Sequence, residues 1–208
     1  MESVLDRVIK QNTENVNLLK TKDYNIFSVL QIQSKEVLIC RMIADLLNPS
    51  GQHGAGAEYL KIFLRDCLGM EKMDTKLADQ AIVTAEYAID DERRIDIVIE
   101  IGSYFLPIEV KIYAADQKSQ CFDYYQYAKR RDAQAKVYYL TLDGHRPGKD
   151  STSSGSQSVP EEDIVCLSFR EHILNWLKAC KNCGNTGMIP ILEQFIRNIE
   201  QISGYTSE

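Results

Sequence analysis

The feature that most constrains this sequence is a pair of apolar stretches joined by a short turn, RRIDIVIEIGSYFLPIEVKI, at residues 93–112. Both stretches are rich in Ile and Val, which favour β-strands. Gly102 and Ser103 lie between them, and a Gly at the first central position suits a two-residue hairpin turn. The segment therefore predicts an antiparallel β-hairpin whose register is set by its turn.

This register places charged side chains opposite each other on one face of the hairpin. Asp96 faces Glu109, and Arg94 faces Lys111 beside them, because side chains alternate between the two faces of a strand. Two carboxylates this close cannot both ionise without a large penalty unless a cation neutralises them. Since Mg²⁺ and Mn²⁺ prefer carboxylate oxygens, the pattern predicts a divalent-metal site. The alternative is a salt-bridged face, with Asp96 paired to Lys111 and Glu109 to Arg94.

Strands and helices alternate around the hairpin. The predicted strands are 81–89, 94–101, 105–112, 136–142 and 164–167, and the predicted helices are 1–20, 35–48, 57–68, 116–132, 170–179 and 189–202. Pro107 lacks an N–H group, which suits an edge strand or a strand start better than the centre of a sheet. A helix precedes the fourth strand, which can therefore run parallel to a neighbour. The order predicts an α/β fold, with a mixed sheet of four or more strands flanked by helices.

The segment at residues 143–163 differs in composition from the rest of the chain. Gly, Ser, Pro and charged residues dominate it, which predicts a long mobile loop. The length of 208 residues fits one ordinary domain. We therefore expect a single domain over 1–208, with a core at about 34–142 and C-terminal helices at 168–203.

Composition narrows the classes of partner. Lys and Arg number 24 and Asp and Glu 30, for a net charge of −6, which argues against an unselective nucleic-acid coat protein. No apolar run has the length of a signal peptide or a membrane span, so we expect no membrane partner. Six cysteines in such a chain are expected to be reduced, in the cytoplasm. Cys180 and Cys183, with His172 upstream, lack a second ligand pair, and we expect no zinc.

Further residues extend the hairpin into a larger pattern. The stretches KEVLICRMIADLLNPSGQHGAGAEYLKIFL, RRIDIVI and IEVKIYAADQKSQCFDYY resemble a bacterial family within the PD-(D/E)XK nuclease superfamily. The resemblance covers about residues 34–142, and Ile95 stands where the superfamily motif has Pro. The residues that carry it are Glu36, Asp96, Glu109-Val110-Lys111, and Gln120 and Tyr124 of the Gln-x-x-x-Tyr motif. It implies a restriction-endonuclease-like core.

The resemblance also implies a mechanism. Asp96 and Glu109 would bind catalytic Mg²⁺, for which Mn²⁺ would substitute, with the carbonyl of Val110 as a third ligand. Glu36 would be a ligand directly or through water, and Lys111 would orient or activate the attacking water. The implied function is hydrolysis of phosphodiester bonds in nucleic acid, with DNA as the expected substrate. The alternatives are a catalytically silent nucleic-acid- or protein-binding module, and an α/β domain whose charged hairpin is only structural.

Four residues are candidates for substrate binding: Gln120, Tyr124, Arg94 and His53. Gln120 and Tyr124 are four residues apart and share one helix face, so a helix-surface pair is the alternative. His53 either contacts substrate or closes its loop, and Glu36 has the alternative of a solvated helix face. Residues 109–149 hold eight Lys or Arg and five acidic residues, a local excess that suits a phosphate backbone. The sequence leaves room for a homo-oligomer or a protein partner.

Overall fold

The computed structural model describes residues 24–71, 74–183 and 185–204. Its centre is a five-stranded mixed sheet in the order β1-β2-β3-β4-β7. These strands are β1 (Ile82–Ala88), β2 (Arg94–Ile101), β3 (Tyr104–Lys111), β4 (Val137–Thr141) and β7 (Ile164–Ser168). β1, β2 and β3 pair antiparallel, whereas β3, β4 and β7 pair parallel. The predicted α/β class and mixed sheet are confirmed.

The β2–β3 hairpin has the predicted register. Ile97 pairs with Ile108, and Gly102 begins the turn with φ of +57°, a conformation that glycine adopts without strain. β3 is a central strand, although Pro107 favoured an edge or a strand start. Pro107 is tolerated because β3 pairs with β4 only from Ile108 onward, so its missing N–H falls before the parallel ladder begins.

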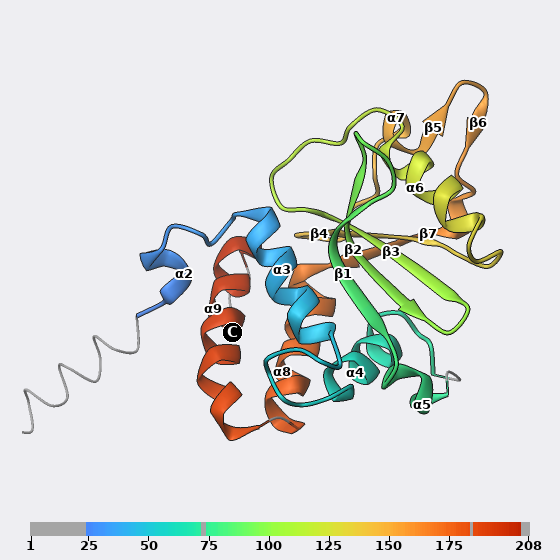
Figure 1. Cartoon of the computed structure of the whole chain (residues 1–208). Coiled ribbons are helices and arrows are strands. Elements are labelled where there is room, and N and C mark those ends of the chain that lie inside the picture. The colour runs from blue at the N-terminus through green and yellow to red at the C-terminus, as the bar shows by residue number, and fades with distance from the viewer. Residues whose placement is uncertain (1–23, 72–73, 184, 205–208) are drawn as a thin grey trace, which may run out of the picture.

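Helices cover both faces of the sheet (Figure 1). Their bounds are α2 (Ile26–Val29), α3 (Glu36–Leu47), α4 (Glu58–Asp66), α5 (Thr75–Ala78), α6 (Gln120–Lys129), α7 (Lys149–Thr152), α8 (Leu174–Cys183) and α9 (Ile189–Ser203). A π-helical turn, Phe169–Ile173, precedes α8, and 3₁₀ turns lie at Glu161–Asp163 and Thr186–Met188. Within the described ranges, no helix has both the length and the apolar character needed to cross a membrane.

Two apolar clusters hold the layers together. Ile97, Ile99 and Ile101 of β2 point into the larger cluster, with side chains of α3, α4, α8 and α9. Val98, between them in sequence, points into the smaller cluster, which contains residues of α6 such as Tyr124. This alternation is the period of two that a strand imposes, and both faces of β2 are therefore buried against helices.

Most predicted elements agree with the structure to within a few residues, but the helix predicted at 116–132 is shorter. α6 spans Gln120–Lys129 because the residues before it are engaged in other contacts. The Asp116 carboxylate accepts hydrogen bonds from the Tyr139 hydroxyl (2.7 Å) and the Gly148 N–H (2.7 Å). The backbone of Ser119 is left-handed, with φ of +57°, so Ser119 lies outside the helix, which begins at the next residue, Gln120. The helix predicted at 1–20 lies outside the described residues.

Residues 143–163, called the insertion below, contain regular structure where a loop was predicted. They form α7, a hairpin of β5 (Ser153–Ser154) and β6 (Gln157–Ser158), and a 3₁₀ turn. The N–H of Ser119 donates to the Asp150 carbonyl (2.7 Å), and the N–H of Cys121 donates to the Ser151 hydroxyl (3.3 Å). Polar composition does not reveal these elements, because it does not show which side chains hydrogen-bond a specific backbone group, as the Ser151 hydroxyl does here.

Candidate active site

A pocket of 250 Å³ opens where the start of α3, the start of β2, the end of β3 and the start of α6 converge. It brings together most of the predicted site residues. Its lining consists of Glu36, Glu92, Arg93, Arg94, Asp96, Glu109, Lys111, Ala114, Ala115, Gln117, Gln120 and Tyr124. Since β3 is parallel to β4 and β7, the pocket lies at the carboxyl end of the parallel part of the sheet, where α/β folds commonly bind ligands.

The two carboxylates lie where the hairpin ladder ends. Continuous pairing of β2 with β3 stops at Ile97, and the Asp96 carboxylate accepts a hydrogen bond from the N–H of Val110 (2.8 Å). Glu109 and Lys111 are buried, with 1% and 7% of their surfaces exposed. The Lys111 ammonium pairs with Oε1 of Glu109, whereas the salt-bridged alternative paired it with Asp96. Oε2 of Glu109 is buried without a hydrogen-bond partner among the described residues.

Glu36 reaches the pocket from the first residue of α3. Its Oε2 accepts a hydrogen bond from the N–H of Ile112 (2.8 Å), directly after β3 ends. This contact anchors Glu36 to the strand that carries Glu109 and Lys111. The side chain is half-buried at the pocket wall, so the alternative of a fully solvated helix face does not describe it.

The pocket is electrostatically unbalanced towards negative charge. Burial, and then the neighbouring Asp96 carboxylate, raise the pKa of Glu109 well above its usual value. Burial also raises the pKa of Asp96. Burial alone would lower the pKa of Lys111, but the carboxylates of Glu109, Asp96 and Glu36 outweigh it and raise that pKa. The four acidic residues of the lining thus outnumber its three cations, of which Lys111 pairs with Glu109 and Arg93 with Asp123, and a further cation would stabilise the ionised carboxylates.

Gln120 and Tyr124 form a buried pair at the pocket wall, with 5% and 1% of their surfaces exposed. The Gln120 amide donates to the Tyr124 hydroxyl (3.0 Å), which in turn donates to the main-chain carbonyl of Arg94. Burial and the nearby Glu109 carboxylate raise the pKa of Tyr124, so its hydroxyl stays protonated at neutral pH. Their burial excludes the alternative of a helix-surface pair, and both residues line the pocket that contains the carboxylates.

Arg93 is a pocket residue that was not predicted. Its guanidinium donates to the Asp123 carboxylate (3.1 Å), to Oε1 of Gln117 (2.8 Å) and to the Lys118 carbonyl (2.6 Å). The alternation of side chains along β2 would place Arg93 on the face opposite Arg94, away from the pocket. This rule does not apply to Arg93, because β2 begins only at Arg94. Arg94 itself is exposed at the pocket rim. Arg93 thus ties the start of β2 to the start of α6.

His53 does not line this pocket and is buried in the loop between α3 and α4. One ring nitrogen, Nε2, lies 3.0 Å from the Asn48 carbonyl, and Nδ1 accepts a hydrogen bond from the N–H of Ala55 (3.1 Å). The ring also stacks on Tyr59, with centroids 4.7 Å apart. These contacts fit the loop-closing alternative for His53.

Replacing His53 with Phe should therefore destabilise the protein without altering the pocket. Phe keeps the stacking on Tyr59 but loses two hydrogen bonds, so the free energy of unfolding should fall by about 1–3 kcal/mol. Urea denaturation measures this loss, and Mn²⁺ calorimetry should show unchanged affinity. A variant with wild-type stability but weaker binding of DNA would instead assign His53 to the substrate.

A mixed five-stranded sheet flanked by helices, with Asp96, Glu109 and Lys111 in one pocket, defines a restriction-endonuclease-like α/β fold. A family model of the PD-(D/E)XK nuclease superfamily matches residues 24–197. The chain belongs to this superfamily, which points to nuclease activity in general and to nucleic acid as the class of substrate. Comparison with curated proteins and with solved structures finds no match.

Proposed function

We propose that this chain is a Mg²⁺-dependent phosphodiesterase that hydrolyses DNA. The observation that carries the proposal is the carboxylate of Glu109, which is buried with one oxygen paired to Lys111 and the other without a partner among the described residues. An unpaired buried polar atom costs about 1–3 kcal/mol. A cation bound there would offset this penalty, and it would also explain why Asp96 faces Glu109.

The donor set fits a hard, hydrated ion. In the described part of the chain, no three His, Cys, Asp or Glu side chains are arranged to hold a metal by themselves. Asp96 and Glu109 would hold the ion with the Val110 carbonyl, and Glu36 would act through water. Mg²⁺ commonly uses one or two carboxylates and keeps several waters, and Mn²⁺ takes the same oxygen ligands. Such an ion supplies positive charge to a scissile phosphate and makes water more acidic.

Lys111 supplies a fixed positive charge beside the carboxylates. Because Glu109, Asp96 and Glu36 raise its pKa, the ammonium keeps its proton at neutral pH. It can therefore orient a nucleophilic water and stabilise the negative charge that develops on the phosphate, rather than accept a proton. Gln120 and the Tyr124 hydroxyl, hydrogen-bonded to each other, would position the substrate from the other wall of the pocket.

The test is cleavage of linear and circular DNA in Mg²⁺ or Mn²⁺ by the wild type, Asp96→Asn and Lys111→Met. Asp66→Asn is the matched control, because Asp66 is exposed and pairs with Arg65 outside the pocket. We expect cleavage only by the wild type and the control, abolished by EDTA. Cleavage of the circle would identify an endonuclease. Cleavage that survives in Asp96→Asn would contradict the assigned site, and cleavage of RNA alone would correct the substrate.

A wild type that cleaves nothing and binds no Mn²⁺ would favour the catalytically silent module.

The six cysteines are free thiols, which supports a reducing compartment, and we propose the cytoplasm as the location. A homo-oligomer or a protein partner stays a prediction.

A further inference from the structure

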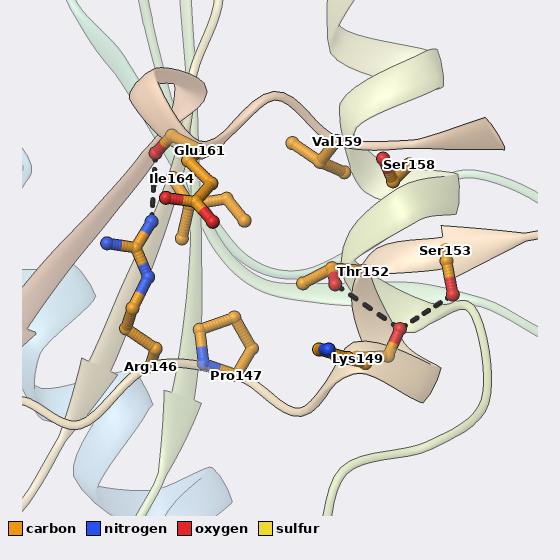
Figure 2. A pocket seen from close by; sticks show the side chains of 9 residues that line it. All are labelled: Arg146, Pro147, Lys149, Thr152, Ser153, Ser158, Val159, Glu161 and Ile164. Atoms are coloured by element: carbon orange, nitrogen blue, oxygen red, sulfur yellow. Dashed lines mark hydrogen bonds between the residues drawn. The ribbon is translucent and has the colours of Figure 1, made fainter.

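We propose that a second pocket, formed by the insertion, binds a nucleotide of the nucleic-acid strand that enters the candidate active site. This inference rests on the proposed function. The pocket has a volume of 410 Å³, which exceeds the 250 Å³ of the candidate active site. Figure 2 shows its lining: Arg146, Pro147, Lys149, Thr152, Ser153, Ser158, Val159, Glu161 and Ile164.

Two cations at this pocket are available to a phosphate. One guanidinium nitrogen of Arg146 donates to the Glu161 carbonyl (2.9 Å), which holds the side chain along the wall, and a guanidinium has further N–H donors. Lys149 is exposed and has no acidic partner within the described ranges. By contrast, Lys129 pairs with Asp163 and Arg131 with Glu100. Arg146 and Lys149 are therefore two cations of this pocket that form no ion pair with a carboxylate among the described residues.

The rest of the lining suits a sugar and a base. Pro147, Val159 and Ile164 provide apolar surface, and Figure 2 shows Pro147 and Val159 on opposite sides of the space between the two cations. Thr152 and Ser153 add hydroxyl groups, and both donate to the Lys149 carbonyl (3.3 and 2.7 Å). A nucleotide combines an anionic phosphate with a flat base whose faces can pack on apolar side chains, so the cations and the apolar residues of this pocket would each have a partner in it.

The insertion is bonded directly to the segment that walls the candidate active site. The N–H and hydroxyl of Ser119 donate to the carbonyls of Asp150 (2.7 Å) and Ser153 (2.8 Å). Gln117 and Gln120, on either side of Ser119 in the chain, line the candidate active site. Ser119 therefore links the wall of the candidate active site to the segment that forms the second pocket, and our proposal is that one strand contacts both.

Glu161, the acidic residue that lines the pocket, allows a substitution that should change the affinity for a nucleic-acid strand in the opposite direction. The carbonyl of Glu161 holds Arg146, and its carboxylate lines the pocket, where it repels a phosphate. Lys149→Ala should weaken binding of a nucleic-acid strand, and Glu161→Gln, which keeps the shape of the side chain, should strengthen it. Lys181→Ala is the control, because Lys181 pairs with Glu193 between α8 and α9.

The experiment is fluorescence anisotropy of a labelled single-stranded DNA of about 15 nucleotides with the full chain in EDTA, at several salt concentrations. We expect Lys149→Ala to bind roughly fivefold more weakly and its log–log salt slope to be shallower by about 0.7, the value for one lost phosphate contact. Glu161→Gln should bind about twofold more tightly, and Lys181→Ala as the wild type does. Thermal unfolding confirms that each variant is folded.

Equal affinity of Lys149→Ala and Lys181→Ala would overturn the inference, as would weaker binding by Glu161→Gln. Displacement of the DNA by an equal concentration of deoxythymidine monophosphate, dependent on Lys149, would assign the pocket to a free nucleotide and overturn the strand assignment. Binding in EDTA does not require cleavage. If no variant cleaves DNA but the Lys149 effect holds, this inference stands and the proposed function fails.

Discussion

Replacing Asp96 with Asn should stabilise the metal-free protein while abolishing cleavage. The Asn side-chain carbonyl can still accept the hydrogen bond that the N–H of Val110 donates to Asp96 (2.8 Å). The change removes the charge that faces Glu109, and burial already raises the pKa of Asp96. We expect a gain of about 1 kcal/mol in the free energy of unfolding at neutral pH. Cleavage should fall by about 10²–10³-fold because a metal ligand is lost.

Urea denaturation in EDTA measures the gain in the free energy of unfolding of Asp96→Asn. The direction in which this gain changes with pH can be predicted. A carboxyl with a raised folded pKa destabilises the protein only where it is ionised. The gain should therefore be complete above the folded pKa of Asp96 and should vanish below about pH 4, where the carboxyl is protonated in both states. Asp66→Asn should stay within about 0.5 kcal/mol of the wild type. A less stable Asp96→Asn that still cleaves DNA would contradict the account.

Replacing Lys111 with Met should have the opposite effect on stability. The carboxylate of Glu109 is 1% exposed and pairs with the Lys111 ammonium, so the variant leaves a buried charge without its partner. Breaking a buried pair in this way costs about 3–5 kcal/mol. Mg²⁺ should restore part of this loss, because a divalent ion replaces the missing charge and binds only the folded protein. Cleavage should be lost as well.

Thermal unfolding in EDTA and in Mg²⁺ tests this prediction. Lys61→Met is the matched control, since Lys61 forms surface ion pairs with Glu58 and Asp79 that are worth about 0–1 kcal/mol. Mg²⁺ should not restore the stability of Lys61→Met, because this variant has lost no charge from the pocket. If Lys111→Met costs no more than Lys61→Met, the pocket does not hold the buried charge pair that the account requires.

The sequence was sufficient to predict the hairpin and the residues that it brings together. The turn at Gly102 sets the pairing observed from Ile97 to Ile101, and extending this register by one residue predicted that Asp96 faces Glu109. Helical spacing indicated only that Gln120 and Tyr124 share a helix face, and the resemblance to the nuclease superfamily implied their place beside the carboxylates. The register and the shared helix face depend on local rules, which act over a few residues and can be read without knowing the rest of the fold.

Contacts between distant segments could not be read in this way. The pairing of Glu36 with the N–H of Ile112 spans the chain from α3 to the end of β3. The guanidinium of Arg93 reaches residues before α6 and, in Asp123, within it, and no periodicity indicates these contacts. The insertion takes regular structure through Ser119 and Asp116, whose side chains select particular backbone groups. Such long-range hydrogen bonds depend on the packed fold.

Calorimetric titration of Mn²⁺ into the metal-free full chain tests the central claim most directly, namely that Asp96 and Glu109 hold a divalent ion. We expect binding by the wild type and by Asp66→Asn, with affinity at least about tenfold weaker in Asp96→Asn. Absence of binding by the wild type, or equal affinity in the wild type and Asp96→Asn, would contradict it.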